Sequence, residues 1–179
     1  MFKVANKAIG KGYKPFIIAE VSANHGGSIQ RAKESILAAK NSGADAVKIQ
    51  TYTPDTMTLD SNKNDFLIND GLWKGYNLYQ LYQEAYTPFE WHKELFDFAK
   101  LQGVTLFSTP FDETAVDLLH NLDVPAFKIA SFEITDLPLI KYAASKGKPL
   151  FISSGMSNQD EIGEALECCY KNGNRDVLL

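Results

Sequence analysis

Residues 104–130, VTLFSTPFDETAVDLLHNLDVPAFKIA, decide the fold class of this chain. Two short apolar runs, 104–108 and 126–130, have the length of buried strands and enclose a segment of helix length. Asp112 is a typical helix-opening residue, and apolar residues recur after it with helical spacing through Leu119. A strand, a helix and a second strand in this order predict a βαβ unit, in which the two strands are parallel.

The same alternation runs along the whole chain. Further apolar runs of strand length occupy residues 16–19, 46–50, 149–153 and 176–179. Further helical patterns occupy residues 29–39, 91–99, 139–144 and 162–169. Strands that are apolar on both faces indicate a parallel sheet covered by helices. We therefore predict an α/β fold, a (β/α)₈ barrel represented by about its first five βα units and the start of strand six.

Two segments depart from this alternation. Residues 2–4 and 7–9 flank a short turn and predict a small hairpin against the barrel floor. Residues 51–87 form a connection rich in Asp, Asn, Gly and aromatics. Connections longer than about 15 residues are usually functional or disordered, and the aromatics favour a folded insertion. Because it leaves the carboxyl end of the second strand, the insertion is predicted on the catalytic side of the barrel. The side chains expected to meet a substrate there are Asn69, Trp73, Tyr76 and Asn77.

The length of the chain limits which domain organisations are possible. A closed (β/α)₈ barrel typically takes about 250 residues, and this chain has 179. Residues 1–179 are therefore expected to be the N-terminal part of a longer barrel protein. The alternative is a complete, small, doubly wound domain.

Composition excludes some partners. The net charge of −4, with acids and lysines mixed along the chain, argues against a nucleic-acid-binding surface. No stretch has the roughly 20 apolar residues of a membrane span, and the first residues do not form a signal-peptide core. The protein is therefore predicted to be cytoplasmic.

Polar residues gather where the predicted strands end, which is where such barrels carry catalysis. Lys48 and Lys128 interrupt apolar strands, and buried lysines are rare unless paired. Two converging cations predict a site for an anionic ligand, with hydroxyl groups nearby. The alternative is that each lysine pairs with a core acid such as Glu20 or Glu133. The other candidate site residues are Asn24, His25, Gln50, Thr109, Ser131 and Ser153.

The sequence predicts different roles for the three histidines. His25 lies in a glycine-containing loop directly after the first strand, where it can approach a ligand. His92 and His120 lie in helical patterns and are predicted to be surface residues. The three show no zinc-binding spacing.

These strand-end segments resemble the sialic acid synthase family. The five motifs occur in the family's order: IIAEVSANHGG at 17–27, VKIQ at 47–50, FSTPF at 107–111, FKIASFE at 127–133 and ISSGM at 152–156. Together they extend over essentially the whole chain. Within the family, TYTPD at 51–55 and GLW at 71–73 look like the branch that makes pseudaminic acid.

The resemblance implies a condensation of phosphoenolpyruvate with an amino-sugar aldehyde, here a diacetamido-trideoxyhexose, to give pseudaminic acid and phosphate. The resemblance also implies residue roles. Glu20, Gln50 and Glu133 would lie near the acceptor sugar and the reacting carbons, with Glu20 or Glu133 as the catalytic acid or base. The phosphoenolpyruvate ligands would be Lys48, Thr109, Lys128, Ser131 and Ser153.

The resemblance further implies a divalent metal, Mn²⁺ or Mg²⁺, that polarises the aldehyde, and a homodimer. The family's metal-binding histidines lie on later strands, so no residue of this chain is predicted as a metal ligand. The family's small antifreeze-like C-terminal domain is also expected outside residues 1–179. This segment alone is therefore expected to bind no metal and to be inactive.

Three alternatives stay open from the sequence. The acceptor can instead be that of an N-acetylneuraminate or legionaminate synthase of the same family. A phosphosugar-binding barrel without condensation chemistry would also use the two lysines, although it would exclude acids such as Glu20 and Glu133. The third alternative is a purely structural segment.

Overall fold

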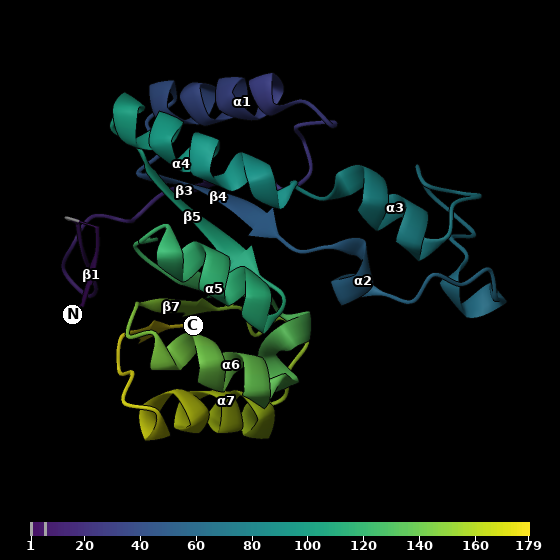
Figure 1. Cartoon of the computed structure of the whole chain (residues 1–179). Helices are drawn as coiled ribbons and strands as arrows, with labels where there is room; N and C mark the ends of the chain where they lie inside the picture. The colour runs from purple at the N-terminus through teal and green to yellow at the C-terminus, as the bar shows by residue number, and fades with distance from the viewer. Residues whose placement is uncertain (1, 6) are drawn as a thin grey trace.

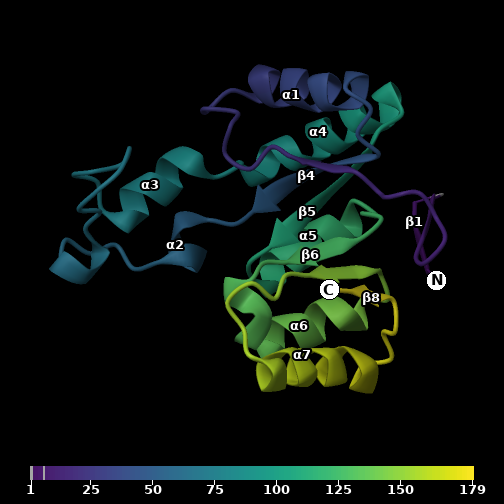
Figure 2. The same cartoon turned by 180° about the vertical axis from the view of Figure 1, so that it is seen from behind.

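Figure 1 shows the computed structural model, which describes residues 2–5 and 7–179. Its centre is a six-stranded, all-parallel sheet in the order β3-β4-β5-β6-β7-β8. The strands are β3 (Ile18–Glu20), β4 (Ala46–Thr51), β5 (Thr105–Pro110), β6 (Phe127–Ile129), β7 (Leu150–Ile152) and β8 (Val177–Leu178). Sequential strands lie side by side, and β8 forms the last edge of the sheet (Figure 2). This is the order of strands in a (β/α) barrel.

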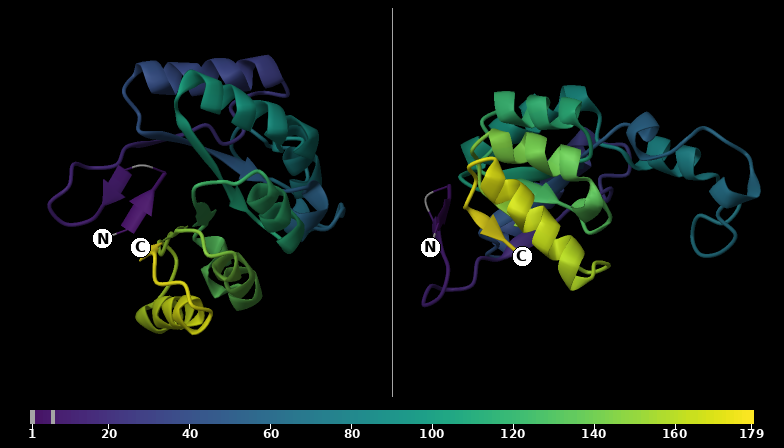
Figure 3. Two further views of the ribbon diagram at one scale, coloured as in Figure 1. Left: turned by 60° about the vertical axis from the view of Figure 1, so that its left-hand side comes forward. Right: turned by 90° about the horizontal axis from the view of Figure 1, so that it is seen from below.

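Helices connect successive strands and follow the outside of the curled sheet (Figure 3). The main helices are α1 (Ile29–Asn41), α4 (Phe89–Gln102), α5 (Glu113–Asn121), α6 (Leu137–Ser145) and α7 (Gln159–Lys171). The structure thus confirms the predicted α/β half-barrel, and the helices extend by up to three residues at either end beyond the apolar pattern.

Local sequence signals set these helix ends. The Asp112 carboxylate accepts a hydrogen bond from the Ala115 backbone N–H at 2.7 Å and begins α5 as predicted. Gly103 ends α4 in the left-handed conformation, with φ of 69°, where a residue without Cβ fits best. Asn158 begins α7 with a capping box that it shares with Glu161.

The hairpin closes the amino-terminal end of the sheet. β1 (Phe2–Val4) and β2 (Lys7–Ile9) pair antiparallel and lie at the opposite end of the strands from α2 and α3 (Figure 1). Val4 and Ile9 belong to a buried cluster with strand residues that include Phe107 and Phe151. The prediction of a hairpin packed against the barrel floor is therefore confirmed.

Alternation along the strands separates the floor from the site. Successive strand residues point to opposite faces of a sheet, so residues two apart share a face. On four strands this face changes from buried apolar to polar within two residues: Ala46 to Lys48, Phe107 to Thr109, Ala126 to Lys128 and Phe151 to Ser153. The opposite face packs against the helices in two further apolar clusters. Polar side chains are thus directed to the carboxyl end of the inner face.

The long connection after β4 is a folded insertion, as predicted. It contains α2 (Pro54–Met57), the 3-10 helix η1 (Asn64–Phe66) and α3 (Leu78–Ala85). α2 and α3 lie beyond the carboxyl end of β4 and extend away from the sheet (Figure 1). No described helix is both long enough and apolar enough to cross a membrane.

His92 corrects one prediction, because it is buried rather than at the surface. Its Nε2 atom lies 2.7 Å from the Thr51 hydroxyl, and its Nδ1 atom lies 3.0 Å from the Pro88 carbonyl oxygen. Thr51 also contacts the Ser108 hydroxyl at 2.6 Å. The histidine lies on the inner face of α4, where it gives the buried Thr51 hydroxyl a second hydrogen-bond partner.

Candidate active site

A cleft of about 740 Å³ opens at the carboxyl ends of the strands. It brings together seven of the predicted site residues: Glu20, Lys48, Gln50, Lys128, Ser131, Glu133 and Ser153. They come from β3, β4, β6, β7 and the loops that follow them, so the parallel register gathers them at one end of the sheet.

Lys48 is the paired cation of this cleft. Glu20 and Lys48 are register partners on β3 and β4, and the carboxylate forms an ion pair with the ammonium group. The ammonium group also donates a hydrogen bond to the Thr109 hydroxyl at 3.1 Å. For Lys48 the structure therefore shows the pairing with Glu20 that we had considered as the alternative.

Lys128 is the unpaired cation. Its ammonium group donates to the Ser153 hydroxyl and to the Ile129 carbonyl, and among the described residues it forms no ion pair with a carboxylate. Burial, together with the charge of Lys48, lowers the pKa of Lys128 to about 8. A half-buried cation with only neutral acceptors leaves positive potential in the cleft, which favours an anionic ligand.

Glu133 is the acid with a free oxygen. It lies in η2 (Phe132–Thr135), and its Oε2 atom is buried with no hydrogen-bond partner in the described part of the chain. Burial raises the pKa of Glu133 above its ordinary value. Ser131 immediately precedes η2, and its hydroxyl makes no capping bond to that helix. Both side chains can therefore turn to a ligand in the cleft.

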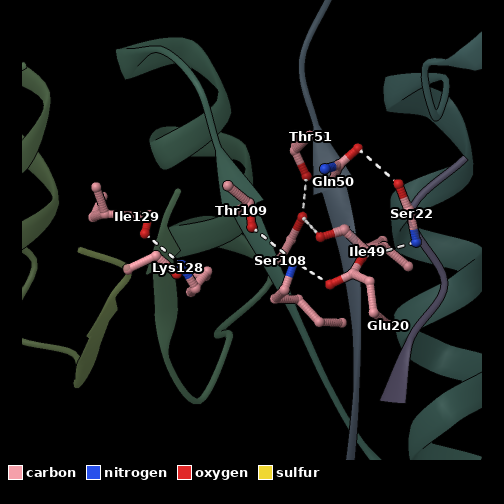
Figure 4. A network of polar contacts seen from close by, with 11 residues as sticks. Glu20, Ser22, Ile49, Gln50, Thr51, Ser108, Thr109, Lys128 and Ile129 are labelled. Atoms are coloured by element: carbon pink, nitrogen blue, oxygen red, sulfur yellow. Dashed lines mark hydrogen bonds and ion pairs between the residues drawn. The ribbon is translucent and has the colours of Figure 1, made fainter. Parts of the chain in front are cut away.

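Ser22 supports the carboxylate of Glu20, a role that the sequence did not reveal. Its backbone N–H donates to Glu20 Oε1 at 2.8 Å, and its hydroxyl donates to Gln50 Oε1 at 3.3 Å (Figure 4). Ser22 has a φ of 50°, a strained conformation for a residue other than glycine. Both oxygens of Glu20 are thus engaged, one by Ser22 and the other by Lys48.

The cleft also has apolar lining residues that the sequence reasoning missed. Met57 comes from α2, Tyr82 from α3, Phe111 from the loop after β5, and Phe132 from η2. Phe111 could have been predicted, because it directly follows Pro110, the last residue of the strand that carries Thr109. Met57 and Tyr82 depend on the path of the insertion, which leaves no periodic signal in the sequence.

Asn24 and His25 lie outside this cleft. The His25 ring is buried, its Nδ1 accepts from the Gly27 N–H at 3.2 Å, and its Nε2 lies 3.2 Å from the Thr87 hydroxyl. These contacts hold the loop against the start of α4. Asn24 is exposed and lines a neighbouring hollow of about 410 Å³.

The four candidate residues of the insertion lie outside the strand-end cleft. Trp73 lines the same neighbouring hollow as Asn24 and contacts the Tyr76 ring edge-on at 5.4 Å. Asn77 is buried, begins α3 with a capping box and donates to Asn62 at 2.9 Å. Asn69 is exposed. None of Asn69, Trp73, Tyr76 and Asn77 lines the strand-end cleft, because the loop that carries them folds back on itself through the Leu67–Asn77 bridge.

The described residues do not supply a complete metal site. No group of three or more His, Cys, Asp and Glu side chains in this part of the chain is placed to hold an ion. Glu133 offers one unpartnered oxygen, whereas Glu20 is engaged by Lys48 and Ser22. A divalent cation would need ligands beyond these residues.

In comparisons with known proteins, this chain is similar to several enzymes named as synthases of nine-carbon sugar acids. The pseudaminic acid synthase of Helicobacter pylori is 50% identical over 92% of this chain and 48% of its own length. The N,N'-diacetyllegionaminic acid synthase of Legionella pneumophila is 37% identical over 97% of this chain and 49% of its own length. A crystal structure of N-acetylneuraminic acid synthetase from Leptospira borgpetersenii superposes with a TM-score of 0.85 at 26% identity, over 98% of this chain and 56% of that one.

The chain spans about half the length of the curated relatives it matches. The model of the NeuB family matches residues 35–179, which include the strand ends of β4 to β7 and the cleft they form. The half-barrel, the polar cleft and this match agree, and the chain belongs to the NeuB family.

Proposed function

We propose that the intact protein condenses phosphoenolpyruvate with a diacetamido-trideoxyhexose to form pseudaminic acid and phosphate. The observation that carries the proposal is the juxtaposition of Lys128 and Glu133 in one cleft. Among the described residues, Lys128 forms no ion pair with a carboxylate and the buried Oε2 atom of Glu133 has no hydrogen-bond partner. The 50% identity to a pseudaminic acid synthase supports the choice of acceptor over the 37% identical legionaminic acid synthase.

We expect phosphoenolpyruvate to bind at the cationic side of the cleft. Lys128 would contact an oxygen of the phosphate or carboxylate group, because charge-assisted hydrogen bonds are the strong ones. Ser131 and Ser153 would add hydroxyl donors, while Lys48 and Thr109 would hold the side nearest β4. Glu20 forms an ion pair with Lys48 and fixes the position of its ammonium group beside the bound anion.

The reaction needs two proton movements that a carboxyl group can handle. Carbon three of phosphoenolpyruvate bonds to the aldehyde carbon, whose oxygen becomes an alkoxide and takes up a proton. Water adds at carbon two and loses a proton, which leaves a hydroxyl group on that carbon. The bond from carbon two to the phosphate oxygen then breaks, and the hydroxyl proton passes to the departing phosphate, so that a keto group forms. The products are the nine-carbon keto acid and inorganic phosphate.

Glu133 is the acid or base that we propose for these steps, rather than Glu20. Its raised pKa lets it hold a proton closer to neutral pH than an ordinary glutamate, which suits general acid–base catalysis. Both carboxylate oxygens of Glu20 already have partners. Glu20 is therefore better suited to position Lys48 directly and Gln50 through Ser22. A phosphosugar-binding barrel without chemistry would have no use for an acid with a free oxygen here.

Further parts of the proposal rest on the family relationship. They are a divalent metal (Mn²⁺ or Mg²⁺), a homodimer and a cytoplasmic location, as for a biosynthetic enzyme. Because the described residues do not furnish a complete set of metal ligands, no step above is assigned to the metal.

A coupled assay tests the function. The intact protein is incubated with phosphoenolpyruvate, Mn²⁺ and one acceptor in ¹⁸O-water, and phosphate and sugar products are analysed by mass spectrometry. We expect phosphate only when the acceptor is present, and phosphate without the solvent label. Label in the phosphate would reveal hydrolysis at phosphorus, and binding of phosphoenolpyruvate without any phosphate release would favour the non-catalytic barrel. A panel of diacetamido-trideoxyhexoses and N-acetylmannosamine separates pseudaminate, legionaminate and neuraminate synthesis.

A further inference from the structure

The strand-end cleft has two chemically different sides. Its charged and hydroxyl side chains come from the barrel strands and from the loops after β6 and β7. Met57 and Tyr82 come instead from the insertion, and Phe111 comes from the loop after β5. We define the apolar wall as these three residues, Met57, Tyr82 and Phe111. The wall offers carbon surface to part of any ligand whose charged groups are held by Lys128.

Tyr52 joins the two halves of the wall. Its ring contacts the Tyr82 ring edge-on at 5.7 Å between centroids and the Phe111 ring at 5.4 Å, with interplanar angles of 83° and 84°. Tyr52 is only 3% exposed and does not itself line the cleft. It lies two residues beyond Gln50, so it anchors both rings to the end of β4. Edge-to-face pairs of this kind prefer a defined geometry, which fixes the wall.

Hydrogen bonds tie the insertion to the barrel at the same place. The Thr56 hydroxyl on α2 donates to the Asp112 carboxylate at 2.7 Å, and Asp112 also caps α5. The Tyr79 hydroxyl on α3 donates to Asp55 on α2 at 3.2 Å. α2 and α3 are thus held to each other and to the start of α5. The wall is preformed, which lowers the entropic cost of binding against it.

The chemistry of the wall selects a class of acceptor. Met57 and Phe111 carry no hydrogen-bond donor, so a sugar hydroxyl against them would lose its water without gaining a partner. A methyl group, whether at a deoxy carbon or in an acetamido group, would instead be buried favourably.

We infer that Met57, Tyr82 and Phe111 form the subsite for the methyl-bearing groups of the acceptor, and that Tyr52 is the positioning residue that holds this subsite in place. The inference rests on the proposed function and deepens it, since it names the residues that distinguish a deoxy, diacetamido acceptor from a fully hydroxylated one.

The test compares two acceptors across matched variants of the intact protein. kcat/KM is measured for the diacetamido-trideoxyhexose and for N-acetylmannosamine, together with KM for phosphoenolpyruvate. Met57→Ser and Phe111→Ala should lower the preference for the deoxy acceptor by about 10-fold or more, because one methyl-sized contact changes discrimination by roughly 10–200-fold. Trp73→Ala is the control from the same insertion, outside the cleft, and should leave the ratio unchanged.

Tyr52 needs a readout that separates positioning from folding. Tyr52→Leu should raise the acceptor KM while the KM for phosphoenolpyruvate stays constant, and Tyr52→Phe, which keeps the ring, should restore the wild-type acceptor KM. Thermal melts report whether each variant is folded. If Tyr52→Leu does not fold, the cleft-lining variant Met57→Ser tests the subsite in its place.

The outcomes are distinct. An active wild type whose acceptor ratio is unchanged in Met57→Ser and Phe111→Ala overturns this inference alone. The same follows if Trp73→Ala changes the ratio and the wall variants do not. A wild type that releases phosphate with none of the acceptors overturns the proposed function, and this inference with it.

Discussion

Lys128 on β6 donates a hydrogen bond to the Ser153 hydroxyl at the end of the neighbouring strand β7, and among the described residues it forms no ion pair with a carboxylate. Lys48 shows the contrast, because its charge is balanced by the Glu20 carboxylate on the adjacent strand. The difference between the two lysines leads to the first two predictions.

Phosphoenolpyruvate binding should weaken as the pH rises through about 8. The pKa of Lys128 is lowered to about 8 by burial and by Lys48, so the cation that attracts the anion is lost above that pH. Protonation falls from roughly nine-tenths at pH 7 to one-tenth at pH 9, which predicts about a tenfold weaker Kd by calorimetry. Lys128→Arg should bind with little dependence on pH over this range, because a guanidinium group stays charged. A wild-type Kd that is constant from pH 7 to 9 would exclude Lys128 from the site.

Removing the charge of Lys128 should stabilise the fold and abolish anion binding. A lysine with a lowered pKa disfavours the folded state while it is protonated, so Lys128→Met should raise the free energy of unfolding at pH 7 by about 1–3 kcal/mol. The wild type should itself gain stability from about pH 8 to the ordinary lysine pKa, since the unfolded chain binds more protons there. Urea unfolding at pH 7 and pH 10 checks both statements, and the gain from Lys128→Met should shrink at pH 10. A destabilised Lys128→Met at pH 7 would mean that the ammonium group has a compensating partner.

Glu133 should be more important for turnover than Glu20. Glu133→Gln should lower kcat by roughly 10²–10⁴-fold while phosphoenolpyruvate still binds, because the amide cannot move a proton. The wild-type pH–rate profile should contain an ionisation above the ordinary glutamate pKa, which the variant lacks. Glu20→Gln is the matched control and should mainly change substrate binding through Lys48. Equal profiles for wild type and Glu133→Gln would assign the proton transfer to another group.

Asn77 should contribute to the stability of the insertion rather than to catalysis. Asn77→Ala removes the capping box of α3 and the hydrogen bond to Asn62. A lost N-cap costs about 1 kcal/mol, and the reduced stability should appear in thermal melts. Asn77→Asp keeps the cap and serves as the control. If Asn77→Ala melts like the wild type but loses activity, Asn77 has a direct role that the structure does not suggest.

The residues of the polar side of the cleft were predictable because strand geometry is regular. A side chain two residues beyond an inward apolar residue must also point inward, so Lys48, Lys128 and Ser153 could be placed from the sequence pattern and the family motifs. The same pattern could not decide which lysine pairs with Glu20. That depends on the register between β3 and β4, which places Glu20 beside Lys48.

The insertion was predictable as a folded element but not in its detail. Trp73 was predicted to meet the substrate from its residue type and its place in the insertion, whereas Tyr82, another aromatic residue of the insertion, lines the strand-end cleft. Which of the two aromatic residues lines the cleft depends on where α3 packs. The sequence of the loop has no periodic pattern from which the position of α3 could be predicted. The prediction that His92 lies at the surface was wrong for a related reason. His92 is buried against the hydroxyl of Thr51, which lies on a strand distant in sequence.

The apolar floor below the cleft affects how ions compete for the site. Phe151 is the register partner of Lys128, and its ring contacts Phe107 at 5.4 Å in the cluster closed by Val4 and Ile9. Within the described residues, this apolar floor blocks mobile salt ions from below and leaves the side of the cleft open to the Lys128 ammonium group. Ionic screening acts far less on partly buried charges than on surface lysines. Binding of a phosphorylated ligand should thus persist at salt concentrations that suppress adsorption of anions to the outer helices.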